Sequence, residues 1–233
     1  MPVARPLWLI DLDNTLYDAS WRVMGEINRR MTAFMAERLS LSEQQASHLR
    51  ERYWHRYGAT LLGLVRHHEI DPYEFLAQTH PHQELHHLVP KSRGGRYRVS
   101  RLAGERWLLT NASRRYAHRL LQLLGLKRCF DRVIAMEDMK LIGRLRPKPS
   151  MLLMRALLRQ SGRPAERVRL IDDHDENLQA AHRLGMRTAR VLTSKTVRRR
   201  ARDSGRPLAA RRPSYVRLQV HCLGSLIRAQ HFR

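Results

Sequence analysis

Short apolar runs alternate with amphipathic stretches along much of the chain, which is the pattern of a parallel sheet covered by helices. The runs predict strands at 7–10, 106–110, 132–135, 168–172 and 187–192. Helical spacing of apolar residues is found at 113–125, 150–161 and 175–184. The sequence Leu7-Trp8-Leu9-Ile10 is apolar throughout, which indicates a strand buried on both faces. We therefore predict an α/β fold with a parallel sheet.

The first two predicted strands are separated by about ninety residues without a convincing strand, a length that should fold as a unit of its own. Residues 21–39 and 42–57 have helical periodicity, and Ser42 with Gln45 has the spacing of a capping box. Shorter helices are predicted around Leu61 and at 72–77. We predict that residues 18–90 form an inserted helical domain and that residues 1–17 and 91–233 form the α/β core.

Polar side chains follow the predicted strands at the edge where open α/β sheets bind ligands. Asp11 and Asp13 come directly after the first strand, Thr110 and Asn111 end the second, and Asp172 with Asp173 ends a later one. The stretch Asp11-Leu12-Asp13-Asn14, taken alone, is equally typical of a structural turn. The repeated placement favours a functional site.

Lys148 lies between two prolines, in Arg146-Pro147-Lys148-Pro149. Proline fixes its own φ and biases the residue before it toward an extended conformation, so this stretch predicts a rigid loop that presents the lysine. Arg144 and Arg146 are interpreted as surface charges without a catalytic role.

Four stretches, in this order and spacing, resemble the haloacid dehalogenase superfamily, in its phosphatase branch and most closely in its pyrimidine 5'-nucleotidase-like group. They are Asp11 to Tyr17, Trp107 to Ala112, Arg146 to Ser150, and Leu170 to Leu178 continuing to Gly185-Met186. The resemblance implies a Rossmann-like core with an inserted helical cap, which controls water access and substrate choice.

The resemblance also implies a reaction at a phosphate ester. Asp11 would be the nucleophile that forms an aspartyl-phosphate, and Asp13 would be the general acid and base. The second aspartate separates the phosphatases from the dehalogenases of the same superfamily. Thr110 and the amide of Asn111 would bind phosphoryl oxygens, and Lys148 would neutralise charge on the phosphoryl group and on Asp11.

By the same resemblance, Asp173 aligns with the metal-binding carboxylate, and Asp172 joins directly or through water. Asp11 and the carbonyl of Asp13 complete an oxygen set of the kind that Mg²⁺ prefers. A capped helix start is the structural alternative for these acidic residues, and both roles are compatible. His174 stands where relatives often have serine, and we expect a solvated loop histidine.

A nucleoside 5'-monophosphate is the substrate that the resemblance favours, with phosphoglycolate or another small phosphorylated metabolite as the alternative. Tyr57 and Thr60, in the predicted cap, lie in a stretch that resembles the nucleotidase-like group. Aromatic residues at helical spacing are more often packing residues, so packing is the simpler interpretation for both.

Histidines and cysteines indicate no second metal site or disulfide. Adjacent histidines do not share a helix face, and no cysteine or acidic pattern completes a closed site around them. Two cysteines without a signal peptide or an apolar membrane-spanning run fit a cytoplasmic protein with no membrane partner. The residues concerned are His67, His68, His80, His82, His86, His87, Cys129 and Cys222.

The formal net charge of +23 raises a second class of function, a non-catalytic polyanion-binding protein on a phosphatase scaffold. Residues 194–233 contain eleven basic residues and one acidic residue, and Arg198-Arg199-Arg200 predicts weak, nonspecific nucleic-acid contact. Only five of the 44 basic residues are lysine, which also fits a compositional bias toward arginine. No nucleic-acid-binding motif is visible, so the enzyme is favoured. The tail predicts a strand at 215–220 and a helix at 222–229.

Overall fold

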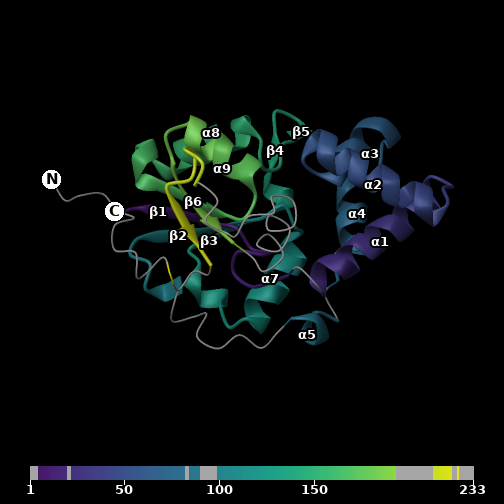
Figure 1. The fold of residues 1–233 in the computed structure, drawn as a ribbon, viewed down its shortest axis with the longest axis horizontal. Helices are drawn as coiled ribbons and strands as arrows, with labels where there is room; N and C mark the ends of the chain where they lie inside the picture. The colour runs from purple at the N-terminus through teal and green to yellow at the C-terminus, as the bar shows by residue number, and fades with distance from the viewer. Residues whose placement is uncertain are drawn as a thin grey trace.

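The computed structural model describes residues 5–19, 22–81, 84–89, 99–192, 212–221 and 225. An α/β core holds a six-stranded sheet, and a group of helices lies beside it (Figure 1). The predicted fold class is confirmed.

All paired strands of the sheet run parallel, and β1 and β6 occupy its centre. The chain fills the side with β2 and β3 first and the side with β6, β7 and β8 later. The order reverses beside β1, which is the place where open sheets bind ligands. The strands are β1 (Leu7–Ile10), β2 (Glu105–Leu109), β3 (Arg132–Ile134), β6 (Val168–Asp172), β7 (Arg187–Val191) and β8 (Leu218–Val220), in the order β3-β2-β1-β6-β7-β8.

Both faces of the sheet are covered, as the apolar β1 predicts. Leu7 and Leu9 belong to a hydrophobic cluster with α8 (Met151–Ser161) and α9 (Asp175–Arg183). Trp8 and Ile10 point to the other face, where α7 (Arg114–Leu123) supplies Tyr116, Ala117 and Leu120. Figure 1 shows α8 and α9 on one side of the strands and α7 on the other. The three predicted core helices are confirmed.

The described part of the segment between β1 and β2 is largely helical, as predicted. Ser42 and Gln45 form the expected capping box, with 3.2 Å from the Gln45 amide to Ser42 Oγ and 2.9 Å from the Ser42 amide to Gln45 Oε1. Gly63 allows close helix packing, because a Cβ there would stand 2.3 Å from Cγ of Tyr53. The helices are α1 (Val23–Arg38), α2 (Glu43–Tyr57), α3 (Thr60–His68), α4 (Pro72–Thr79) and the short α5 (Leu85–Leu88). Helices α1 to α4, which we call the cap, form the group beside the core, and α5 lies near α7 (Figure 1). The division into domains at residues 18 and 90 stays a prediction.

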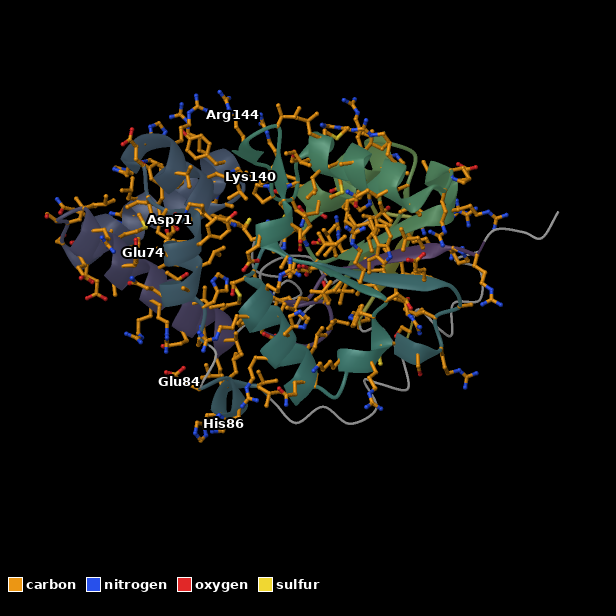
Figure 2. All side chains as sticks on the ribbon, turned by 180° about the vertical axis from the view of Figure 1, so that it is seen from behind. Asp71, Glu74, Glu84, His86, Lys140 and Arg144 are labelled. Carbon is orange, nitrogen blue, oxygen red and sulfur yellow. The ribbon has the colours of Figure 1, made fainter. Side chains whose placement is uncertain are left out.

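A two-stranded hairpin between β3 and α8 has no counterpart in the sequence analysis. Its strands, β4 (Lys140–Leu141) and β5 (Arg144–Leu145), have two residues each, which is too short for an alternation to be visible. Ile142 and Gly143 form the turn, both with positive φ. Figure 2 shows the side chains of Lys140 and Arg144 on this hairpin, that of Glu74 on α4, and that of Asp71 at the N-cap of α4.

The tail is described only in part. Strand β8 begins at Leu218 rather than at 215, because the amide of Val216 bonds to the carbonyl of Pro213 in a turn that precedes it. The predicted helix at 222–229 and the basic stretch 198–200 lie outside the described residues, apart from residue 225.

Candidate active site

The polar residues that follow three neighbouring strands meet at the carboxyl edge of the sheet. Asp11 follows β1, Thr110 follows β2, and Asp172 ends β6. The backbone fixes these positions: the amide of Asp11 bonds to the carbonyl of Ile171 and that of Thr110 to the carbonyl of Ile134, both at 3.0 Å. The Thr110 hydroxyl accepts a hydrogen bond from the Ala112 amide at 3.1 Å, so its own proton remains for donation to a ligand.

Lys148 joins two of these strand ends through its side chain. Its Nζ lies 2.6 Å from Asp11 Oδ1 and 2.8 Å from Asp172 Oδ2. Lys148 and Asp172 are 2% and 0% exposed, so the ammonium is held away from bulk water. A cation in this place can neutralise a phosphoryl group as it approaches Asp11.

Asn111 holds the backbone of Lys148, a role that the sequence analysis did not predict. Its Nδ2 donates to the Lys148 carbonyl and its Oδ1 accepts from the Lys148 amide, both at 3.0 Å. Asn111 is therefore bound to the lysine loop by its side chain. The predicted contact of its backbone amide with a phosphoryl group stays a prediction.

Burial governs the electrostatics of this cluster. It raises the pKa of Asp11 to about 7, with Asp172 and Asp173 acting in the same direction and Lys148 opposing them. Burial raises the pKa of Asp172 as well, but Lys148 and His174 outweigh it and the net pKa is lowered. Burial lowers the pKa of Lys148, but the carboxylates of Asp11 and Asp172 outweigh burial. The net pKa is therefore raised above its ordinary value. The lysine is therefore cationic at any ordinary pH.

The chain turns after Asp13, and the carboxylate of Asp13 accepts hydrogen bonds from two tyrosine hydroxyls. Asn14 adopts φ 61°, a left-handed conformation that asparagine tolerates, and its Oδ1 accepts from the Ala19 amide. Tyr17 and Tyr116 each donate to Asp13 Oδ1, at 2.7 and 2.6 Å. Burial raises the pKa of Asp13, and these two hydrogen bonds oppose the shift.

Asp172, Asp173 and His174 form a group whose ligand atoms all lie within 4.8 Å of one another. Asp172 is already bound by Lys148 and by Asn177 Nδ2, which lies 3.0 Å from its Oδ1 and 2.9 Å from its Oδ2. Asp173 Oδ1 lies 2.9 Å from His174 Nδ1. The oxygen donors and the excess of buried negative charge around Asp11 fit a hard divalent cation.

His174 is not simply solvated. It is the N-cap residue of α9, where its side chain makes no capping hydrogen bond. Its ring is about half exposed and pairs with Asp173. Burial lowers the pKa of His174, but the hydrogen bond and charge of Asp173 dominate and raise it to about 9.

The C-terminal end of α2 lies over the loops that carry Lys148 and Asp173. The ring of Trp54 lies 6.4 Å from that of His174 between centroids, and Gly58 stands against Pro149. Tyr57 donates to or accepts from His67 at 2.6 Å, and the buried Thr60 donates to the Arg50 carbonyl. Tyr57 and Thr60 therefore have partners inside the cap, as the packing interpretation predicts.

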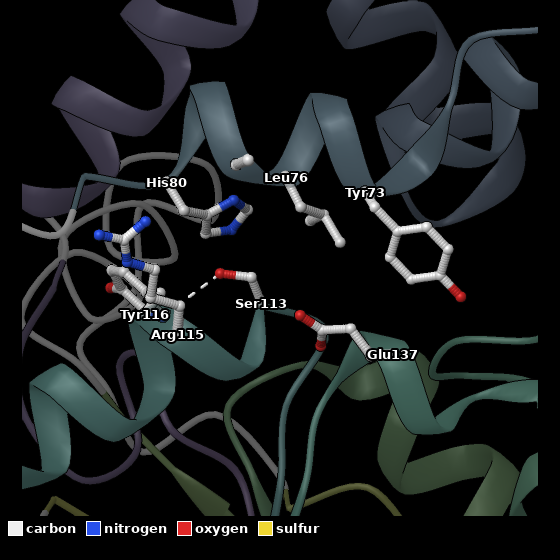
Figure 3. Close-up of a pocket in the computed structure, with 8 residues that line it drawn as sticks. Tyr73, Leu76, His80, Ser113, Arg115, Tyr116 and Glu137 are labelled. Carbon is white, nitrogen blue, oxygen red and sulfur yellow. Dashed lines mark hydrogen bonds between the residues drawn. The ribbon is translucent and has the colours of Figure 1, made fainter.

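A small cavity of about 90 Å³ lies between the cap and the core, next to Tyr116. In Figure 3, Tyr73, Leu76 and His80 reach it from α4 and its C-terminal end, and Ser113 and Tyr116 line the opposite wall. Burial lowers the pKa of His80 to about 4, against a weaker opposing contribution from its backbone hydrogen bond with Leu76. His80 is therefore a neutral histidine in the contact between cap and core.

Two other histidines and the described cysteine are accounted for by structural contacts. His67 and His68 bond to Tyr57 and Tyr53. Cys129 is free and buried in the core. His82 and Cys222 lie outside the described residues, and within those described the group at Asp172 is the one set of potential metal ligands.

Comparison with known proteins agrees with this arrangement. The family model of the haloacid dehalogenase-like hydrolases matches residues 8–191, from the second residue of β1 to the end of β7. The chain belongs to this family.

One curated protein is similar in sequence, and solved phosphatase and dehalogenase structures are similar in fold. Phosphate metabolism protein 8 of Saccharomyces cerevisiae is 26% identical over 199 residues, covering 78% of this chain and 60% of that protein. A phosphatase of the family from Thermococcus onnurineus has a TM-score of 0.60 and 15% identity, covering 97% of each chain. L-2-haloacid dehalogenase from Xanthobacter autotrophicus, solved with chloropropionic acid covalently bound, has a TM-score of 0.56 and 17% identity, covering 96% of this chain and 97% of that one.

None of the described helices is both long and apolar enough to cross a membrane.

Proposed function

We propose that this hydrolase is a magnesium-dependent phosphomonoesterase that acts through an aspartyl-phosphate on Asp11. The observation that carries the proposal is the position of Lys148, whose Nζ lies 2.6 Å from the Asp11 carboxylate inside a buried site. A dianionic phosphate ester is repelled by a carboxylate nucleophile unless positive charge is fixed beside it. A second carboxylate, Asp13, follows two residues later.

The reaction divides between the two aspartates. A carboxylate oxygen of Asp11 attacks phosphorus, the ester P–O bond breaks, and its electron pair passes to the leaving oxygen, which takes a proton from Asp13. Water then attacks the aspartyl-phosphate, its proton passes to Asp13, and the electron pair of the broken P–O bond returns to Asp11. Asp13 thus ends the cycle protonated, as it began.

Lys148, Thr110 and the amide of Asn111 would hold the phosphoryl oxygens. Asp11, the carbonyl of Asp13, Asp173 and, directly or through water, Asp172 would hold Mg²⁺. The ion would supply positive charge against the phosphoryl oxygens and would offset the burial that raises the pKa of Asp11.

The substrate class proposed is a small phosphorylated metabolite, with a nucleoside 5'-monophosphate favoured over phosphoglycolate. Trp54 is 40% exposed where α2 lies over the site, and an exposed aromatic ring of this kind can stack on a nucleobase. Release of phosphate from uridine, cytidine and adenosine 5'-monophosphates and from phosphoglycolate would compare the candidates directly.

The test of the chemistry is Asp11→Asn with an aryl phosphate in the presence of Mg²⁺. Turnover should fall by about 10³-fold or more, because an amide is a poor nucleophile. Asp131→Asn is the matched control, since Asp131 is exposed and lies away from the strand ends that carry the site. Mass spectrometry of acid-quenched wild-type protein should find a phosphoryl group on the peptide that contains Asp11. Substantial turnover by Asp11→Asn would refute the proposal.

A further inference from the structure

Two tyrosines from distant parts of the chain converge on one oxygen of Asp13. The hydroxyls of Tyr17 and Tyr116 lie 2.7 and 2.6 Å from Asp13 Oδ1 and 3.0 Å from each other. Tyr17 follows β1, and Tyr116 lies in the first turn of α7. Both rings are buried, Tyr116 completely.

Each tyrosine is held by its own surroundings. An isolated β-bridge joins Asp13 to Tyr17 and closes the turn between them. Ser113 caps α7 by accepting from the Tyr116 amide, which fixes the start of that helix. On the side of the cap, the ring of His80 packs edge-on against Tyr116, 5.3 Å between centroids. The two hydroxyls are therefore presented to Asp13 by a rigid frame.

This geometry distinguishes the two carboxyl oxygens of Asp13. A carboxyl oxygen that accepts two O–H groups has no room for a proton of its own, so Asp13 in its acid form carries the proton on Oδ2. Among the described residues, no hydrogen bond reaches Oδ2. That oxygen remains available to a ligand at the carboxyl edge of the sheet.

We propose that Tyr17 and Tyr116 are positioning residues, which hold Asp13 by Oδ1 so that Oδ2 delivers the proton to the leaving oxygen. The inference rests on the proposed function and adds to it the two residues that orient its general acid. When the ester P–O bond breaks, its electron pair passes to the leaving oxygen, and the Oδ2–H bond supplies the proton. The two phenols keep their protons and stabilise the resulting carboxylate through Oδ1.

A phenol has an ordinary pKa of about 10 and keeps its proton at neutral pH, which agrees with an orienting role for both tyrosines.

The test uses leaving groups that differ in their need for a proton. The variants are Tyr17→Phe, Tyr116→Phe and the double variant, with kcat/KM measured for 2,4-dinitrophenyl phosphate and for a nucleoside 5'-monophosphate. Dinitrophenolate leaves without protonation, whereas an alkoxide requires it. Because general acid catalysis contributes about 10²- to 10⁴-fold, the double variant should lose roughly 100-fold on the alkyl ester and less than about threefold on the aryl ester. Each single variant should show a smaller loss with the same preference.

Tyr53→Phe is the matched control. Tyr53 is also a buried tyrosine with a bonded hydroxyl, 2.8 Å from His68 Nε2, but it lies in the cap. Any loss of kcat/KM in Tyr53→Phe should be equal for both substrates. A merely structural role for Tyr17 and Tyr116 would likewise lower kcat/KM equally for both esters, and that result would overturn the inference, as would full activity of the double variant on the alkyl ester. If one single variant fails to fold, the other gives the same comparison.

Asp13→Asn separates this inference from the function on which it rests. The variant should lose more activity on the alkyl ester than either tyrosine variant and should show the same preference for dinitrophenyl phosphate. If Asp13→Asn hydrolyses both esters at the wild-type rate, the proposed function fails. If Asp13→Asn behaves as expected and the tyrosine variants show no preference, only the positioning role fails.

Discussion

Lys148 and Asp172 form a fully buried ion pair, with 2.8 Å between Nζ and Oδ2, and the same Nζ lies 2.6 Å from Asp11. The pair joins the loop before α8 to the end of β6. The cation therefore has two functions in one place, since it compensates buried carboxylates in the folded protein and would meet the phosphoryl group of the substrate.

We predict that Lys148→Met destabilises the fold as well as abolishing turnover. Removing one partner of a buried pair leaves an uncompensated charge and costs about 3 to 5 kcal/mol of unfolding free energy. Urea denaturation measures the loss, and Lys140→Met is the control because Lys140 is exposed on the hairpin. If Lys148→Met is as stable as Lys140→Met, the ion pair contributes nothing to stability.

The two hydrogen bonds between Asn111 and the backbone of Lys148 predict that Asn111→Ala lowers stability and turnover, but by less than Lys148→Met does. Asn111→Ala removes both, at a cost of about 2 kcal/mol. Turnover should fall by roughly 10- to 100-fold, because small displacements of catalytic groups are costly. Asn28→Ala removes a comparable side-chain bond to Arg50 in the cap and should leave turnover nearly unchanged. Equal turnover in the two variants would show that the hydrogen bonds between Asn111 and Lys148 do not position the lysine for catalysis.

His80 predicts a dependence of stability on pH. Its pKa is about 4 in the folded protein, below the ordinary value of 6.5 that applies to the unfolded chain. The unfolded chain binds the proton first as the pH falls, so stability decreases between pH 6.5 and 4 and is fully present above 6.5. From about pH 7.5 to about pH 5 the loss is about 2 kcal/mol.

The measurement is the difference between wild type and His80→Gln in urea denaturation at both pH values. Other titrating groups contribute equally to the two proteins, and glutamine does not titrate. The wild type should lose about 2 kcal/mol more than the variant over this interval. Parallel pH profiles would show that His80 takes up its proton in the folded protein as readily as in the unfolded chain.

Much of the core could be predicted because its signals are local. Four apolar residues in succession identify β1, and polar residues at the strand ends point to one edge of a parallel sheet, which is why Asp11, Thr110 and Asp172 could be expected to lie together. Hairpin β4–β5 was missed because two-residue strands carry no periodicity.

The supporting contacts could not be predicted, since they depend on residues far apart in the sequence. Tyr116 reaches Asp13 across 103 positions, and the side chain of Asn111 reaches Lys148 across 37. A tyrosine at helical spacing is typical of a packing residue, and an asparagine after a strand is typical of a turn. Nothing in one sequence distinguishes these residues from others of their kind.

The last prediction separates the proposed roles of Asp13 and Asp173 at the metal. In Asp13→Asn the backbone carbonyl remains, so Mg²⁺ affinity measured by calorimetry should stay close to that of the wild type while turnover falls by about 10²- to 10⁴-fold. In Asp173→Asn a charged ligand is lost, so the affinity should fall by more than the roughly 10- to 100-fold typical of losing an outer partner of a metal ligand.

Excess Mg²⁺ should restore part of the turnover of Asp173→Asn and none of that of Asp13→Asn, because only Asp173→Asn is limited by occupancy of the metal site. Asp131→Asn again serves as the control for an aspartate outside the site. Equal loss of Mg²⁺ affinity in Asp13→Asn and Asp173→Asn would show that the side chain of Asp13 belongs to the metal site, and its role as the general acid would then have to be given up.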